Sequence, residues 1–465
     1  MSSIKLLAPP TNKGIKTLEK LLFKRSIELA ALRVDVATCP KVLPALEGSL
    51  LNIPKLRHLI EDPQDLDWRD ALVCTDAVVS LPDIDSLPDN VKQFALSEKA
   101  ELVTHSVELD YDYWSADQIL RSILPDDLEV PSAFEMVGHI AHLNLREQHM
   151  PYKNIIGQVI IDKHKYIKTV VNKLDSIDHT FRFFKMEVLA GEDNFVTEMK
   201  EGGCRFQFDY SKVYWNSRLQ GEHERLVKSF GSSDLICDVM AGVGPFAVPA
   251  AKTRGAVVFA NDLNPDSYSS LVGNVGLNRV GHLVRPYNMD GRAFIRQSLT
   301  YLNDPAVWEE FRKNVQVKRP ARHPKIPPTE AEREAERLAE VQKTKQLHPP
   351  EGFKIFHHYV MNLPATAIEF LDAFRGLLHG KENIVPDDKL PIVHVHCFSK
   401  AEDLDADVIE RAEHYLGASI KGCVVNIHRV RDVAPKKEML CLSFRIPPAV
   451  AYADPAGESR PEEAR

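Results

Sequence analysis

An apolar run that ends in a glycine turn is the feature that most constrains the fold of this chain. Residues 235–246 read L-I-C-D-V-M-A-G-V-G-P-F, so the run ends at Asp238 and a turn with Gly242 and Gly244 follows. The small apolar residues of 246–251 then favour a helix. Glycines let the backbone of such a turn approach a ligand closely, because they carry no Cβ. The stretch therefore predicts the first strand, turn and helix of a nucleotide-binding α/β unit.

Strands and helices alternate regularly after this turn. Four further strands, each followed by a helix, are expected at 255–261, 283–288, 353–361 and 391–397. These repeats predict a mostly parallel sheet with helices on both faces. A closing hairpin of 423–430 and 438–446 would add antiparallel strands at one edge. The charged, proline-bounded stretch 319–352 is expected to be a solvated helix or a disordered insertion without a catalytic role.

Polar residues stand at the ends of the expected strands. They are, in strand order, Asp238, Asp262, the pair Asp290 and Gly291, and Asn362. The carboxyl ends of parallel strands meet at one edge of the sheet, where open α/β sheets bind their ligands. At such a place Asp262 can accept hydrogen bonds from both hydroxyls of a ribose. The pattern fits a small nucleoside cofactor such as S-adenosylmethionine. An NAD-dependent enzyme is the alternative, because the turn also reads as G-x-G-x-x-A.

A segment just upstream carries a candidate proton acceptor. Residues 213–225 read V-Y-W-N-S-R-L-Q-G-E-H-E-R, in which Arg218 and Glu222 would be neighbours on one helix face. One interpretation is that the two residues form only a surface ion pair. Because the segment runs into the glycine turn, the alternative is that Glu222 is a base beside the nucleotide site. Basic and aromatic residues are interleaved over 160–215, a mixture that binds phosphates and stacks on unpaired bases. With a formal net charge of -8, the chain can bind a nucleic acid only through such a local basic face.

The chain is long enough for several domains, and we divide its 465 residues into four parts. They are an α+β module at 1–105, an α+β RNA-binding domain at 106–230, the α/β domain at 231–450 and a disordered tail at 451–465. In the module, residues 15–32 have helical spacing and 71–79 have strand-like spacing. Seven cysteines without C-x-x-C spacing indicate a reduced, intracellular protein, and no apolar run is long enough to span a membrane.

The first 25 residues contain six basic residues and one acidic residue. This composition resembles a mitochondrial transit peptide, and a solvated first helix of the module is the alternative. We expect the protein in the cytoplasm, the mitochondrial matrix and the nucleus.

Several motifs in order resemble the archaeal and eukaryotic tRNA (guanine-37-N1)-methyltransferase family. Within 113–450 they are G-H-I-A-H-L-N-L, F-R-F-F-K-M-E-V-L-A-G, V-Y-W-N-S-R-L-Q-G-E-H-E-R, D-V-M-A-G-V-G-P-F, N-D-L-N-P, M-D-G and N-L-P. The resemblance implies a class I methyltransferase-like Rossmann fold preceded by α+β RNA-binding domains. It implies S-adenosylmethionine as cofactor, the anticodon loop of tRNA as partner, and methyl transfer to N1 of guanosine 37. We further expect a monomer without a metal ion.

The resemblance also implies roles for individual residues. Four catalytic residues are implied. Glu222 would be the general base, Arg218 the catalytic arginine four residues before it, Arg182 the group that stabilises charge on guanine O6, and Asn362 the holder of the base edge. The motif reads N-L-P where the family often has N-P-P, and it keeps the asparagine. With the glycine turn included, the expected cofactor contacts are His223, Asp238, Gly242, Gly244, Asp262, Leu263, Asp290, Gly291 and Asn362.

The expected chemistry needs a base, because guanine N1 carries a proton. A carboxylate partly buried beside an apolar cofactor pocket would have a raised pKa and would serve well. A fixed guanidinium would stabilise the charge that develops on O6. Two alternatives stay open: an aminocarboxypropyl transferase of wybutosine biosynthesis that uses the same cofactor, and a non-catalytic RNA-binding protein.

Overall fold

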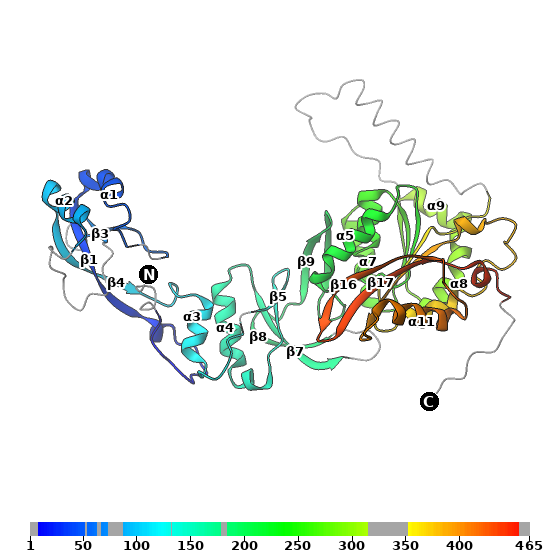
Figure 1. Ribbon diagram of the computed structural model, residues 1–465, viewed down its shortest axis with the longest axis horizontal. Helices are drawn as coiled ribbons and strands as arrows, with labels where there is room; N and C mark the ends of the chain where they lie inside the picture. Colours follow the sequence, from blue (N-terminus) through cyan, green and yellow to red (C-terminus); the bar gives the residue numbers. More distant parts are fainter. Residues whose placement is uncertain are drawn as a thin grey trace, which may run out of the picture. The chain divides into compact units, whose positions relative to one another are not determined.

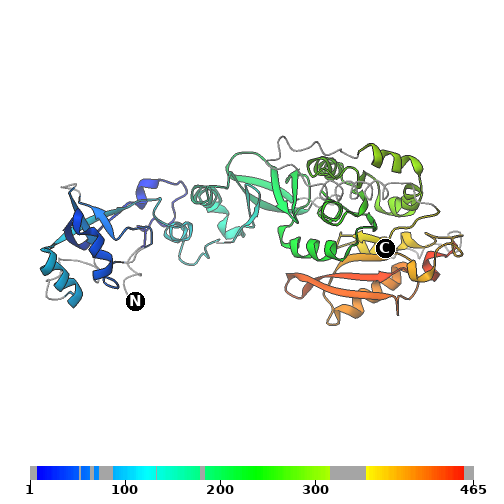
Figure 2. The same cartoon turned by 90° about the horizontal axis from the view of Figure 1, so that it is seen from above.

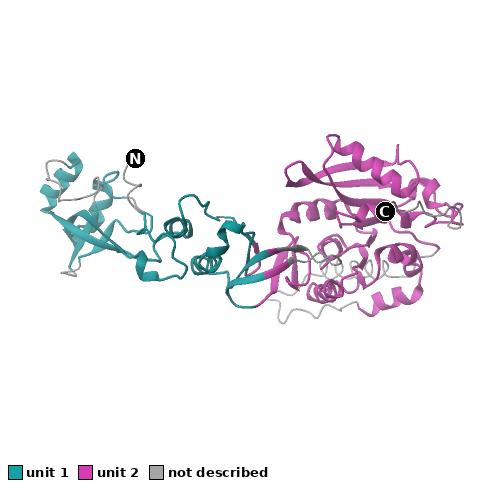
Figure 3. Cartoon of the chain, turned by 90° about the horizontal axis from the view of Figure 1, so that it is seen from below, with its two compact units in different colours: residues 1–135, 140–173, 187–193 teal, residues 136–139, 174–186, 194–465 magenta. Residues whose placement is uncertain are grey.

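The computed structural model forms two compact units, whose elements are shown in Figures 1 and 2. The first unit comprises residues 1–135, 140–173 and 187–193, and the second comprises 136–139, 174–186 and 194–465 (Figure 3). The described residues are 8–51, 54–62, 67–72, 87–131, 133–177, 184–314 and 352–454, with side chains described outside 175–184. The predicted insertion lies outside this part except for residue 352. The tail from residue 455 onward also lies outside it.

An antiparallel sheet replaces the helix expected for residues 15–32. The 3-10 helix η2 (Lys20–Phe23) precedes strand β1 (Arg25–Asp35), so the predicted helix is wrong. Pairing with two neighbours outweighs the local helical spacing, because it buries Ala30, Ala31 and Leu32 completely. The sheet order is β2-β3-β1-β4, with β2 (Leu59–Glu61), β3 (Trp68–Leu72) and β4 (Glu101–Leu109). The predicted strand at 71–79 begins in β3 and leaves the described residues after 72.

The segment before β1 is part of the first unit. Phe23 is fully buried, and its carbonyl accepts a hydrogen bond of 2.8 Å from Trp114 Nε1. The amides of Asn12 and Gly14 donate to carbonyls at the end of α3 (Ala116–Ile123), and the ammonium of Lys13 pairs with Asp126 at 2.7 Å. Residues 8–25 therefore contribute to the core and its hydrogen bonds.

A second four-stranded sheet has the order β5-β6-β7-β8. Its strands are β5 (Glu135–Val137), β6 (Ile140–Leu143), β7 (Thr169–Ile177) and β8 (Phe184–Gly191). The lysine-rich residues 163–173 form the end of α4 (Lys153–Lys163), a turn and the start of β7. Thr169, Val170 and Val171 are fully buried on this strand. Their β-branched side chains pack well in a sheet, which favours a strand here. The remaining elements of these parts are η3 (Val36–Thr38), α1 (Cys39–Ala45), α2 (Asp89–Glu98) and η5 (Glu147–Tyr152).

The seven-stranded sheet of the second unit confirms the predicted α/β fold. Its order is β13-β12-β11-β14-β15-β17-β16. The strands are β11 (Leu235–Asp238), β12 (Val257–Asn261), β13 (Val284–Tyr287), β14 (His358–Met361), β15 (Ile392–Ser399), β16 (Val424–Ala434) and β17 (Lys437–Arg445). The first five are parallel, and β17 is antiparallel to β15 and β16. The chain order reverses at β11, which places a ligand crevice outside the carboxyl end of this strand.

Helices cover both faces of this sheet (Figures 1 and 2). One layer contains α8 (Gly291–Leu302), the 3-10 helix η8 (Ala367–Phe374) and α11 (Leu404–Leu416), and η8 contacts both α8 and α11. The other contains α5 (Gln220–Ser229), α6 (Ala247–Pro249), the π-helix η7 (Ala250–Arg254) and α7 (Pro265–Leu277). Further helices are η6 (Ser217–Leu219), α9 (Pro305–Lys313), η9 (Asp387–Lys389) and α12 (Pro448–Ala451). Among the helices described here, none is long and apolar enough to cross a membrane.

A two-stranded hairpin over residues 196–209 packs on α7. Its strands are β9 (Val196–Glu201) and β10 (Cys204–Asp209), joined at Gly202 and Gly203. Buried Asn274 accepts a hydrogen bond from the amide of Gln207 at 2.7 Å and donates to the carbonyl of Val243 at 3.0 Å. One side chain thus connects the hairpin to the glycine turn.

Candidate active site

The glycine turn borders open space at the carboxyl end of β11. Gly242 and Gly244 have φ angles of +56° and +99°, which favour glycine. A Cβ on Gly244 would lie 2.8 Å from Leu271 Cδ1, whereas one on Gly242 would meet no described heavy atom within 4 Å. Gly244 is therefore needed for packing, and Gly242 leaves room for a ligand.

Asp262 is fixed beside this turn. Its carboxylate accepts hydrogen bonds from the amides of Gly242 at 2.8 Å and Asn264 at 2.9 Å. Burial raises the pKa of Asp262, while these amides oppose the rise. The neighbouring Leu263 is 49% exposed, and Asn288 donates to the carbonyls of both residues. The acid predicted to bind a ribose thus lies at the crevice.

Asp238 is completely buried at the end of β11. Neither carboxylate oxygen has a hydrogen-bond partner of normal geometry among the residues that the structure describes. Burial and the nearby charge of Asp262 raise the pKa of Asp238 to about 8, so the group is mostly protonated at neutral pH. The backbone amides of Met240 and Ala247 oppose this rise, and a buried acid so weakly paired suits a site that a ligand completes.

The third and fourth strand ends supply further polar groups. Asp290 is exposed and caps α8 by accepting from the amide of Ala293 at 3.0 Å. Gly291 is buried, and a Cβ there would come within 3.1 Å of the Phe370 ring. Asn362 follows β14, and its buried Oδ1 has no partner in the described part of the chain. The open space at Gly242, the acids and this orphaned oxygen together fit a polar nucleoside cofactor.

Asn261, which the sequence analysis did not select, holds the strand ends together. Its Nδ2 donates to the carbonyls of Val239 and Met289, both at 3.0 Å, and its Oδ1 accepts from the amide of Met289. One buried amide thus joins the ends of β11, β12 and β13. A buried asparagine at a strand end is a recognisable signal, because its amide must find partners.

Glu222 lies in a buried charged cluster on α5. Its side chain is 2% exposed and accepts two hydrogen bonds from Arg225, from Nε at 2.6 Å and from Nη2 at 2.8 Å. His396 Nε2 is 2.7 Å from Oε1, and His428 Nε2 is 3.7 Å from Oε2. Burial would raise the pKa of Glu222, but hydrogen bonds from Arg225 and His396 outweigh it and lower the pKa to about 2. The expected raised pKa is therefore wrong for this arrangement.

Arg218 is not the partner of Glu222 in this cluster. It is exposed in the 3-10 helix η6, whereas Glu222 is in the first turn of α5. Continuous α-helical geometry, on which the expected neighbour relation depended, begins only at Gln220. Arg225, three residues after Glu222, takes the position instead. Arg182 lies outside the described residues.

His396 is completely buried on β15. Burial alone would lower the pKa of His396, but Cys441 and Glu222 raise it to about 10. Ligand atoms of Glu222, His396 and Cys441 lie within 4.8 Å of one another, a grouping that metal ions can use. Here Arg225 hydrogen-bonds to both carboxylate oxygens and supplies the positive charge itself. The cluster is therefore a salt-bridged network. Its His396 ring lies 5.8 Å from the ring of Phe246, so the cluster adjoins the end of the glycine turn.

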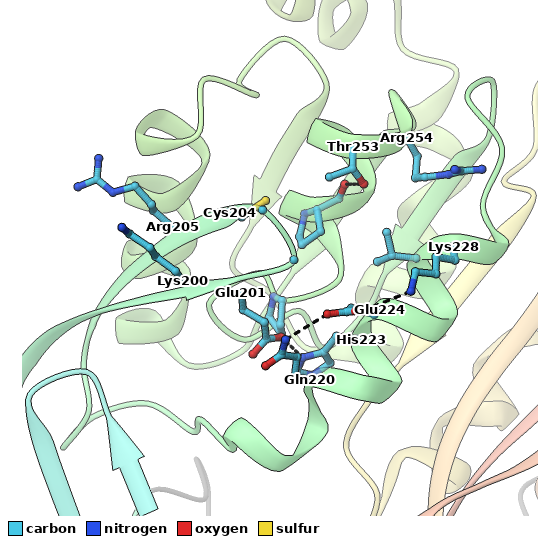
Figure 4. A pocket seen from close by; sticks show the side chains of 15 residues that line it. Lys200, Glu201, Cys204, Arg205, Gln220, His223, Glu224, Lys228, Thr253 and Arg254 are labelled. Carbon is cyan, nitrogen blue, oxygen red and sulfur yellow. Dashed lines mark hydrogen bonds and ion pairs between the residues drawn. The ribbon is translucent and has the colours of Figure 1, made fainter. Parts of the chain in front are cut away.

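His223 faces away from Glu222. Its Nδ1 is 2.5 Å from Glu201 Oε1, and its ring contacts Phe246 at 4.8 Å between centroids. Both paired residues line a cavity of about 700 Å³ between the β9–β10 turn, α5 and η7 (Figure 4). Its exposed cations are Lys200, Arg205, Lys228 and Arg254. The residue expected to contact the cofactor is thus paired with Glu201 beside the turn.

The strand order and the crevice define the fold of S-adenosylmethionine-dependent methyltransferases. Residues 197–307 match the TRM5/TYW2 methyltransferase domain, and 116–194 match the TYW2 N-terminal domain. The solved structures of Trm5b from Pyrococcus abyssi and of aTrm5 in complex with tRNALeu are similar in fold. Their TM-scores are 0.53 and 0.57 and their sequence identities 22% and 21%, and each comparison covers 90% of this chain and 99% of the other.

Curated relatives give the family. A protein of Batrachochytrium dendrobatidis is 52% identical, covering 97% of this chain and 92% of the relative. One of Schizosaccharomyces pombe is 44% identical, covering 95% and 96%. Both are named tRNA (guanine(37)-N(1))-methyltransferase. The chain belongs to the tRNA (guanine(37)-N(1))-methyltransferase family.

Proposed function

We propose that the protein transfers a methyl group from S-adenosylmethionine to N1 of guanosine 37 in tRNA. Its family membership supports the reaction, and the observation that carries it is the buried carboxylate of Glu222, whose partner His396 adjoins Phe246 of the glycine turn. When bound, the cofactor supplies an electrophilic methyl group. The chain's residues must then hold the guanine, take the proton from N1 and stabilise the charge on O6.

Arg225 controls whether Glu222 can take that proton. With a pKa of about 2, the carboxylate is a weak base in the described arrangement. If Arg225 no longer donated its two hydrogen bonds, the burial of Glu222 would raise the pKa of its carboxylate. We infer that guanine binding displaces Arg225 from Glu222 and thereby activates the base. The 29% exposure of the Arg225 side chain supports such a movement.

Three further residues have proposed roles. Asn362 would hold the guanine edge, and its partnerless buried oxygen supports this role. Arg182 would stabilise charge on O6, and Arg218, which is exposed, would contact the substrate beside Glu222. His223, Leu263 and the strand-end acids remain proposed cofactor contacts.

The anticodon loop is the proposed RNA contact. In the first unit, Tyr166 is 87% exposed and lies close in sequence to exposed Lys165 and Lys168, which supports stacking on an unpaired base. In the second unit, exposed Lys200 and Arg254 at the cavity add local positive charge, whereas Arg205 and Lys228 pair with Glu198 and Glu224. We propose that the protein acts as a monomer.

For its location we propose the cytoplasm, the mitochondrial matrix and the nucleus, on the basis of the basic N-terminus. Because Phe23 is a core residue, a targeting signal here must act without removal of residues 8–25. Mass analysis of the N-terminus of protein isolated from mitochondria tests this, and a mature chain that begins after residue 25 would contradict it.

Mass analysis of tRNA incubated with the protein and S-adenosylmethionine tests the reaction. We expect a gain of one methyl group at position 37 and none in a transcript with adenosine there. An aminocarboxypropyl adduct or no change would refute the proposal. Glu222→Gln is expected to keep tRNA binding and to lower methyl transfer at least a hundredfold. Glu224→Gln is the matched control, because Glu224 on the same helix contacts Gln220 and Lys228 instead. Undiminished methylation by Glu222→Gln would refute the general base.

A further inference from the structure

A general base must lose its proton before the next turnover, and Glu222 is almost sealed from water. Its side chain is 2% exposed. Of the three side chains described above as its polar neighbours, Arg225 stays protonated at any working pH, and His396 is completely buried. His428 alone among these three is both titratable near neutral pH and substantially exposed, at 39% of its side chain.

We propose that His428 carries the proton from Glu222 to solvent after methyl transfer. This inference rests on the proposed function. The proton that leaves guanine N1 converts the Glu222 carboxylate to the neutral acid. The acid O–H then donates to His428 Nε2, which regenerates the carboxylate. The imidazolium releases a proton from Nδ1 to water or a buffer base, and proton exchange with water returns the ring to its Nδ1–H tautomer. Only O–H and N–H bonds form and break, and one proton leaves for each methyl group transferred.

The charges around the cluster favour His428 over His396 as the acceptor. His396 holds its proton already, because Cys441 on β17 and Glu222 on α5 raise its pKa against the effect of burial. Partial burial lowers the pKa of His428 most, and the charge of Arg225 lowers it further. The charge of Glu222 raises it. His428 is therefore neutral and ready to accept a proton at physiological pH.

The position of His428 on the edge strand suits this exit. β16 is the last strand of the sheet, and His428 pairs in register with Cys441 of β17. The register holds the backbone of His428 beside the cluster, while the edge leaves one side open to water. The 3.7 Å from Nε2 to Glu222 Oε2 slightly exceeds a hydrogen bond, and a small side-chain movement or one bridging water would close it.

The test follows methyl transfer and proton release in one turnover. Full-length protein in excess is mixed with tRNA and S-adenosylmethionine in weak buffer, and a pH indicator reports protons. In the wild type, both signals are expected to rise together. In His428→Gln, methyl transfer should stay within about twofold, while proton release should lag at least tenfold and added imidazole should restore it. His414→Gln, which changes an exposed histidine on α11, is the matched control.

Each other outcome overturns a defined statement. Proton release that keeps pace with methyl transfer in His428→Gln would show another exit and refute the proposal. A lag that imidazole leaves unchanged would also refute it, because a missing proton acceptor can be replaced from solution. Equal loss of methyl transfer and proton release in the variant would assign His428 to the transfer step or to folding. Absence of methyl transfer in the wild type would refute the proposed function itself.

Discussion

Replacing Glu222 with glutamine should remove a pH-dependent part of the stability of the second unit. Burial lowers the pKa of His396, but Cys441 and Glu222 raise it from 6.5 to about 10. A raised pKa gives stability that is fully present below the unfolded value and is lost as the pH rises through the folded value. At about 1.4 kcal/mol for each pH unit, wild-type stability should fall by up to about 4 kcal/mol from about pH 6.5 to about pH 9.5.

In Glu222→Gln, His396 loses its anionic neighbour while it stays buried, so its pKa should fall and this dependence should shrink. The difference in unfolding free energy between wild type and variant should therefore be largest near pH 6.5 and should narrow by about 2 to 4 kcal/mol near pH 9.5. Other titrating groups act alike in both proteins, so their effects cancel in the difference. Glu224→Gln should show the wild-type dependence, because it leaves the cluster intact.

Urea unfolding at the two pH values, followed by fluorine NMR of 5-fluorotryptophan, makes the measurement. Trp215 and Trp308 report on the second unit separately from tryptophans of the first. A constant difference between Glu222→Gln and wild type across this range would refute the charged His396–Glu222 pair. The same pH dependence of unfolding free energy in Glu222→Gln and Glu224→Gln would also refute this charged pair.

Three further predictions test other parts of the structure. Phe23→Ala should lower the unfolding free energy of the first unit by about 3–5 kcal/mol in urea, because it leaves a cavity in the core. Gly242→Ala should keep the fold but weaken S-adenosylmethionine binding at least tenfold by calorimetry, whereas Gly380→Ala, with a similar positive φ and equally open space, should leave it unchanged. Asn274→Ala should destabilise the second unit by about 1–3 kcal/mol, measured by urea unfolding, because the amide of Gln207 loses its acceptor.

The fold of the second unit could be predicted because its signals are local. Short apolar runs, glycine turns and following helices each occupy about 20 residues, and the topology follows from their repetition. The error at residues 15–32 has the opposite cause. β1 is a strand because β3 and β4, which begin at Trp68 and Glu101, pair with it, and a single-sequence window does not contain those partners.

The candidate site divides in the same way. Asp238, Asp262 and Asn362 were found because Asp238 ends a strand and the other two directly follow one. The environment of Glu222 was missed because His396 is 174 residues away in sequence and reaches it only through the sheet. The alternation in V-H-V-H-C, which places His394 and His396 on a buried strand, was an available signal, since buried histidines require partners.

If Glu222 is the general base, as proposed, its pairing with Arg225 would give the site a means of selecting its substrate base. Displacing Arg225 removes two hydrogen bonds from the Glu222 carboxylate, and the incoming base must supply donors in their place. Guanine offers N1–H and an exocyclic amine as neighbouring donors on one edge, whereas adenine has no proton at N1. A base that lacks these donors leaves Arg225 in place and Glu222 a weak base. Selection then depends on unpaired polar groups, which discriminate more strongly than shape alone.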